Sequence, residues 1–99
     1  MTLEYHPLFA TDLLEAARYL ANEDSLLGFK FIKEVEEAVV EIKKHPLLFP
    51  TVYKEIRRKR LKRFKAYSIR FRYNEQKQLV RVLSLTHGAR HPKTGTGRR

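Results

Sequence analysis

Residues 67–85, YSIRFRYNEQKQLVRVLSL, decide the fold. In residues 67–73, bulky apolar side chains occupy every second position, and polar side chains occupy the positions between them. This period of two predicts a strand with one buried face and one exposed face. Residues 74–77 are polar and predict a turn, and the nearly continuous apolar residues 79–85 predict a strand in the centre of a sheet. The stretch therefore predicts two strands that form the middle of a β-sheet.

Two helices are predicted upstream of these strands. Apolar residues recur at spacings of three and four over residues 8–21, and a longer stripe of the same kind covers residues 26–44. The polar residues between the two stripes break the pattern, and Asp24 or Ser25 is a suitable N-cap for the second helix. Because this break is short, the helices are expected to form an antiparallel hairpin.

The remaining segments complete an α+β domain. Residues 2–6 alternate and predict a short strand, residues 46–52 contain two prolines and predict an ordered loop, and residues 56–64 predict a basic strand. We expect residues 1–92 to form a single domain and residues 93–99 to form a basic flexible tail. The predicted order is β-α-α-β-β-β, with the helical hairpin packed on one face of a small sheet.

The composition excludes several classes of protein. A chain of 99 residues has room for one domain. It contains no cysteine, and its four histidines are scattered, so we expect no disulfide, no metal site and no cofactor. The N-terminus lacks the pattern of a secretory signal, and no apolar run approaches the roughly 18 residues that a membrane span needs. The expected location is the cytoplasm.

The positive charge is concentrated in the second half of the chain. The formal net charge is +10. Residues 1–50 contain 5 Lys/Arg and 9 Asp/Glu, a net charge of −4, whereas residues 51–99 contain 16 Lys/Arg and 2 Asp/Glu, a net charge of +14. Such a field attracts a polyanion, for example nucleic acid or an acidic protein. The alternative is a basic surface that only keeps the protein soluble.

Residues 54–65, KEIRRKRLKRFK, form the densest basic run. Alternate residues of a strand share a face, and the candidate target-binding cations on this one are Arg58, Arg60 and Lys62, with Arg70 and Arg72 from the next predicted strand. Guanidinium forks and ammonium groups gathered in this way bind phosphates or a carboxylate surface. The alternative is an edge strand that its basic residues keep soluble.

Residues 87–92, HGARHP, follow the predicted central strand. His87 can act as an acid or a base near neutral pH, and Arg90 can stabilise a developing negative charge on a phosphate, which makes both candidate catalytic residues. The alternative for His87 is a structural or exposed loop residue. Tyr67 alternates with apolar residues and is expected in the core. The chain contains no nucleophile elbow and no phosphate-binding glycine loop.

Four motifs follow one another over about the first 92 residues. They are a helix start at residues 10–13 (ATDL), a long helix and proline loop over residues 31–50, a basic strand leading to Phe64 and Tyr67, and an apolar strand that ends His87-x-x-Arg90-x-Pro92. In their order, spacing and total length these motifs resemble toxins of the RelE/ParE family of bacterial type II toxin–antitoxin systems.

The resemblance implies two helices over a twisted, mainly antiparallel sheet. It also implies a growth-inhibiting toxin that an acidic antitoxin neutralises in a hetero-oligomer, with no membrane partner. RelE-like members are ribosome-dependent endoribonucleases that cut mRNA with basic residues of the sheet, whereas ParE-like members poison DNA gyrase. Arg58 and Arg60 match positions where the nuclease branch places Lys or Arg, so Arg60 becomes a third candidate catalytic residue.

Other residues distinguish the two branches. Ser68 stands where the nuclease members carry an Arg after the strand Tyr, and the tail lacks their C-terminal Tyr or His. The His87-x-x-Arg90-x-Pro92 ending resembles the ParE-like, plasmid-stabilisation branch, which we therefore favour. Gyrase poisoning and mRNA cleavage both stay open as mechanisms. The alternatives from another class are a non-toxic nucleic-acid-binding module and an inactive toxin homologue.

Overall fold

Five strands form one mixed sheet in the computed structural model, which describes residues 1–88 and 98. The strand order across the sheet is β1-β5-β4-β3-β2. In chain order the elements are β1 (Thr2–Tyr5), α1 (Phe9–Ala21), α2 (Ser25–Lys44), the 3-10 helix η1 (Pro46–Leu48), β2 (Thr51–Tyr53), β3 (Ile56–Arg60), β4 (Tyr67–Asn74) and β5 (Leu79–His87). The chain is an α+β protein, as the sequence predicts.

Strand β4 lies in the middle of the sheet and has antiparallel neighbours on both sides. Its pairing with β5 places Tyr67 opposite His87, and its pairing with β3 places Arg70 opposite Arg58. Strand β1 alone runs parallel to its neighbour, β5. The sheet is thus mainly antiparallel.

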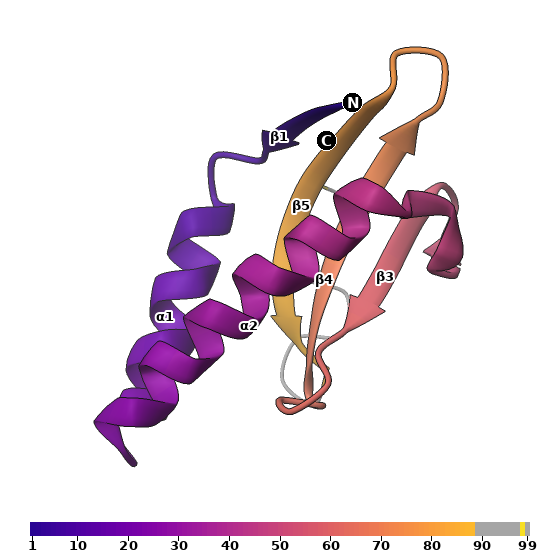
Figure 1. Ribbon diagram of the computed structural model, residues 1–99. Helices are drawn as coiled ribbons and strands as arrows, with labels where there is room; N and C mark the ends of the chain where they lie inside the picture. Colours follow the sequence, from indigo (N-terminus) through magenta and orange to yellow (C-terminus); the bar gives the residue numbers. More distant parts are fainter. Residues whose placement is uncertain (89–97, 99) are drawn as a thin grey trace.

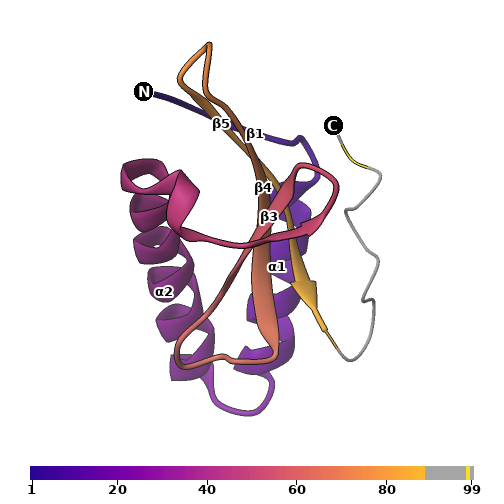
Figure 2. The ribbon, with the colours of Figure 1, turned by 90° about the vertical axis from the view of Figure 1, so that its right-hand side faces the viewer.

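Helix α2 crosses one face of the sheet, and α1 lies beside β5 (Figures 1 and 2). The helices form the expected antiparallel hairpin, and Asp24 caps α2 by accepting a hydrogen bond from the Leu26 N–H at 3.0 Å. Gly28 allows the helices to approach closely, because a Cβ atom there would lie only 3.0 Å from the Ala17 carbonyl oxygen. Neither of the two described α-helices is long and apolar enough to cross a membrane.

The core lies between α2 and the sheet. Phe31 of α2 is completely buried, and its ring meets the rings of Phe64 and Tyr67 edge-on, with centroid separations of 5.1 Å and 4.9 Å. The stripe that the sequence predicts for the second helix supplies the neighbouring buried residues Val35, Ala38, Val39 and Ile42. Removing this apolar surface from water holds α2 on the sheet.

Three segments differ from the sequence prediction. Strand β5 continues to His87, two residues beyond the predicted end at Leu85, because Thr86 and His87 still pair with β4. Residues 46–52, expected to be a loop, form η1 and the start of β2, which extends the sheet beyond β3. A strand as short as β2 is too brief for a recognisable alternation. Strand β3 ends at Arg60, not at residue 64, because the chain then turns towards β4 and the Tyr67 N–H bonds to the Phe64 carbonyl within that turn.

Replacing Phe31 with Ala should lower the free energy of unfolding by about 3–5 kcal/mol, because the change leaves a cavity where the aromatic rings meet. Urea unfolding followed by circular dichroism measures this difference. Phe29→Ala is the matched control, since Phe29 lies on the same helix but is 72% exposed; its loss should stay below about 1 kcal/mol. Similar losses from the two substitutions would contradict the assignment of the core.

Candidate functional site

The side of the sheet that faces away from α2 carries most of the arginines of the strands. Side chains alternate between the two faces of a strand. Ile69, Phe71 and Val82 belong to the core under α2, so their neighbours along β4 and β5 point the other way. We call the polar residues on that side the outer face: Glu4, Arg58, Arg60, Ser68, Arg70, Arg72, Arg81, Ser84 and Thr86.

The strand register arranges part of the outer face in two neighbouring rows. Each row combines arginine with hydroxyl side chains: Arg58, Arg70 and Ser84 in one, and Arg60, Ser68 and Thr86 in the other. Residues directly opposite each other on antiparallel strands have Cβ atoms about 4.5–5.5 Å apart. The two rows therefore concentrate three guanidinium groups and three hydroxyl groups on a small area.

Carboxylates neutralise the arginines at one end of the outer face. Arg81 pairs with Glu4 at 3.4 Å, and Arg72 pairs with Glu55 at 3.8 Å. Within residues 1–88 and 98, the two β3 arginines of the rows make no ion pair. Among the described residues, the positive charge of Arg58 and Arg60 is thus not compensated by an ion pair.

Arg70 shows that this arrangement is electrostatically unfavourable. Its side chain is largely buried. Burial, and then the neighbouring charge of Arg58, lower the pKa of its guanidinium group below the ordinary value. In the same row, the buried hydroxyl of Ser84 has no hydrogen-bond partner in the described part of the chain. Groups held in such an environment are candidates for binding an anion.

The outer face offers charge and hydroxyl groups but no evident acid–base pair. Arginine keeps its proton at neutral pH, and the carboxylates of Glu4 and Glu55 are occupied by ion pairs. Among residues 1–88 and 98, no group of three or more His, Asp or Glu side chains could hold a metal ion. The chemistry this surface supports best is the binding of an anion.

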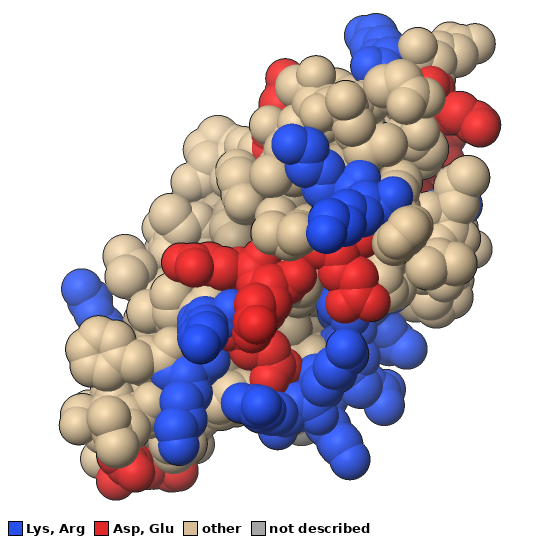
Figure 3. All heavy atoms as spheres, in the orientation of Figure 1, with Lys and Arg blue, Asp and Glu red and all other residues tan. Residues whose placement is uncertain are grey.

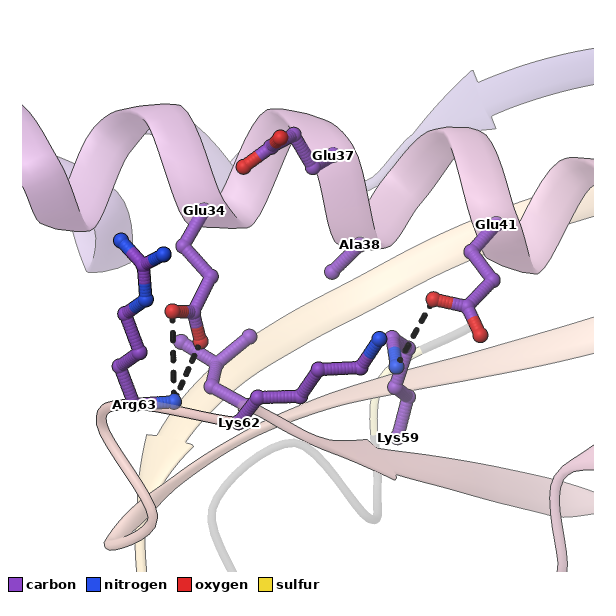
Figure 4. Close-up of a pocket in the computed structure, with 8 residues that line it drawn as sticks. Glu34, Glu37, Ala38, Glu41, Lys59, Lys62 and Arg63 are labelled. Atoms are coloured by element: carbon purple, nitrogen blue, oxygen red, sulfur yellow. Dashed lines mark hydrogen bonds and ion pairs between the residues drawn. The ribbon is translucent and has the colours of Figure 1, made fainter.

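Four of the five predicted target-binding residues lie on the outer face, but Lys62 does not. The prediction for Lys62 extended the alternation of β3, and β3 ends before it, at Arg60. Lys62 instead lines a cavity of about 240 Å³ together with carboxylates of α2. Figure 4 shows its side chain running along that helix.

Two of the three candidate catalytic residues, His87 and Arg60, lie on opposite sides of the sheet. His87 lies opposite Tyr67, with ring centroids 5.0 Å apart. Because Tyr67 belongs to the core, His87 faces the helix side of the sheet, whereas Arg60 faces outward. Arg90 lies outside the described residues.

The sequence analysis missed the buried cation Lys59. It is 6% exposed, its ammonium nitrogen lies 3.2 Å from a Glu41 carboxylate oxygen, and it lies 5.0 Å from the centre of the Phe49 ring. Its position opposite Ile69, a core residue, places it under α2. Strand alternation could have separated Lys59 from Arg58 and indicated that it faces the core.

A second missed contact joins the two ends of the chain. The guanidinium of Arg98 lies 2.6 Å from the Asp12 carboxylate, which also accepts a hydrogen bond from the Leu85 N–H at 3.1 Å. Arg98 in turn donates to the Leu83 carbonyl at 3.0 Å. These two side chains therefore provide hydrogen-bond partners for backbone groups of β5 beyond the residues that pair with β1. Residues 93–97 and 99 of the expected flexible tail lie outside the described part of the chain.

Comparison with known families identifies the chain. Residues 3–92 match the model for the ParE toxin of the type II toxin–antitoxin system parDE. The chain belongs to this family. It is therefore the toxin component of a type II toxin–antitoxin system and has an antitoxin protein as its partner, which confirms the family prediction from the four motifs. No curated protein matches the chain.

Arg58→Gln should raise the free energy of unfolding of this ParE-family toxin by about 0.2–1 kcal/mol, because it removes a like charge directly opposite Arg70. The lowered pKa of Arg70 means that its charged form is disfavoured in the folded state, so removing Arg58 lessens that penalty. Urea unfolding at low ionic strength measures the gain. Arg72→Gln, which breaks an ion pair with Glu55, should give no gain. A loss of stability in Arg58→Gln would refute the repulsion.

Proposed function

We propose that this toxin inhibits growth by binding a nucleic-acid-containing target through its outer face, and that the target is DNA gyrase on DNA. The observation that carries the proposal is the placement of Arg58 and Arg60, which make no ion pair among residues 1–88 and 98. They lie beside Arg70 on the outer face, whereas Arg72 and Arg81 of the same face pair with carboxylates. Such a group binds phosphates through charge-assisted hydrogen bonds and gains affinity by releasing counterions.

The hydroxyl groups of the same two rows support phosphate as the ligand. Ser68 lies opposite Arg60 and Ser84 opposite Arg70, so each hydroxyl is placed to donate a hydrogen bond to an oxyanion beside a guanidinium group. The aromatic side chains of β4 belong to the core or pack against it, so this strand offers no stacking platform for unpaired bases. The surface suits contacts to a phosphate backbone.

The chemistry of the outer face supports gyrase poisoning over mRNA cleavage. A nuclease that uses the 2′-hydroxyl of RNA needs a group that accepts a proton, and guanidinium groups do not do so at neutral pH. His87, the candidate acid or base of the sequence analysis, faces the opposite side of the sheet. Ser68 also replaces the Arg of the nuclease branch.

The partner antitoxin is proposed to be acidic and to form a hetero-oligomer with the toxin. Residues 51–99 carry a net charge of +14, which favours a segment rich in carboxylates. Such a segment could order itself on the toxin surface as it binds.

Substituting Arg58 and Arg60 together with Ala should abolish growth inhibition when the toxin is expressed without its antitoxin. The same change should weaken binding to duplex DNA about tenfold or more at low salt, because phosphate contacts are lost. Colony counts after induction, with immunoblots for protein level, measure the first effect. Lys77→Ala removes a charge in the turn between β4 and β5 and should leave growth inhibition intact. A fully toxic double variant would rule out the outer face as the target-binding surface.

The damaged molecule identifies the target. Gyrase poisoning predicts double-strand breaks in DNA with purified gyrase while mRNA stays intact. Ribosome-dependent cleavage would instead appear as toeprints between codons that disappear in Arg60→Ala. Unimpeded growth with and without the antitoxin gene would favour an inactive homologue, or a non-toxic nucleic-acid-binding module if DNA binding persists with a steep salt dependence.

A further inference from the structure

A row of carboxylates on α2 lies beside a second group of cations, on the helix side of β3. The carboxylates are three or four residues apart and therefore share one side of the helix. The cavity between the two groups is lined by Glu34, Glu37 and Glu41 on α2 and by Lys59, Lys62 and Arg63 on the opposite side (Figure 4). Figure 3 shows acidic side chains gathered across the middle of this side of the molecule, with basic side chains on either flank.

Two of the three carboxylates make structural contacts. Glu41 pairs with Lys59 at 3.2 Å, and Glu34 accepts the backbone N–H of Arg63 at 3.1 Å and 3.3 Å. Glu37 is exposed and makes no ion pair in the part of the chain that the structure describes. Its charge therefore acts on the surrounding solvent and on any approaching ligand, and its removal breaks no described contact.

We propose that the carboxylate row of α2 is an electrostatic boundary that confines a polyanionic target to the outer face. The inference rests on the proposed function, in which the outer face binds nucleic-acid phosphates. Three carboxylates and three cations line the cavity, so the cavity is formally neutral. On the outer face, by contrast, Arg58 and Arg60 make no ion pair in the described part of the chain.

Without the carboxylates, the positive surface would continue past Arg60 to Lys62 and Arg63 and so around the end of β3 onto the helix side. A phosphate chain would then have a second route across the molecule. Opposite charges that line one cavity weaken each other's field at the surface, in addition to the screening that salt provides over roughly 8–10 Å. The carboxylate row therefore acts by disfavouring the binding of a phosphate chain on the helix side of β3. With phosphate contacts limited to the outer face, the target is held in one orientation.

Charge reversal of Glu37 tests the boundary, and Glu36 provides a matched control. Glu36 is the adjacent residue on α2, but it lines a different cavity beside Tyr5 and β1. With a 20-base-pair DNA duplex of random sequence as the probe, Glu37→Lys should bind roughly three- to tenfold more tightly than the wild type at low salt. The salt dependence should steepen by about one phosphate contact or more. Glu36→Lys should change affinity by less than about twofold, since its charge lies away from the cations of the cavity.

Acetylation of lysines, read by mass spectrometry, reports which face the DNA covers. In the wild type and in Glu36→Lys, DNA should leave Lys62 as reactive as in the free protein. In Glu37→Lys, DNA should protect Lys62. Urea unfolding should show that both variants are as stable as the wild type.

The outcomes separate the boundary from the proposed function. Equal gains in affinity from Glu36→Lys and Glu37→Lys, with Lys62 still reactive, would mean that the gain comes from net charge. This result would overturn the boundary but not the proposed function. Protection of Lys62 by DNA in the wild type would also overturn it. Wild-type binding that survives the Arg58→Ala, Arg60→Ala double change would overturn the proposed function, and the boundary with it.

Discussion

The alternation of side chains along β4 is the constraint on which the rest of the structure depends. Tyr67, Ile69 and Phe71 point under α2, so Ser68 and Arg70 must point to the outer face. A slip of one residue in the strand register would bring arginines under α2 and expose the aromatic rings. The register of β4 consequently determines both the core and the candidate binding surface. A change of register would alter both of them.

Cations of the sheet occupy different environments. Lys59 is buried under α2 with Glu41, and Arg72 and Arg81 have carboxylate partners at one end of the outer face. The β3 arginines of the two rows lack such a partner among the described residues. Exposed ion pairs stabilise a protein by only about 0–1 kcal/mol, so stability alone is a weak reason for this placement. Its larger effect is on the local field, which Glu4 and Glu55 weaken at one end of the outer face but which no ion pair among the described residues weakens at Arg58 and Arg60.

The sequence predicts those elements whose pattern of apolar and polar residues extends over many consecutive residues. The apolar stripe of α2 extends over many turns, and the alternation of β4 covers the whole strand, so both elements are recognised from the chain alone. The misplaced residues depend on contacts between distant segments. The position of Lys62 follows from where β3 ends, and the side on which His87 lies follows from its register with Tyr67. The Asp12–Arg98 pair joins residues at opposite ends of the chain, and no local sequence pattern predicts it.

The relative size of two free energies explains how so small a chain tolerates such a charged face. A pair of like charges on opposing strand positions destabilises the fold by about 0.2–1 kcal/mol. A buried aromatic residue such as Phe31, packed against Phe64 and Tyr67, contributes several times as much. The repulsion between Arg58 and Arg70 can therefore persist in the folded protein as long as the core behind it stays intact. Since both depend on β4, the strand that makes the repulsion unavoidable is also the strand whose buried side outweighs it.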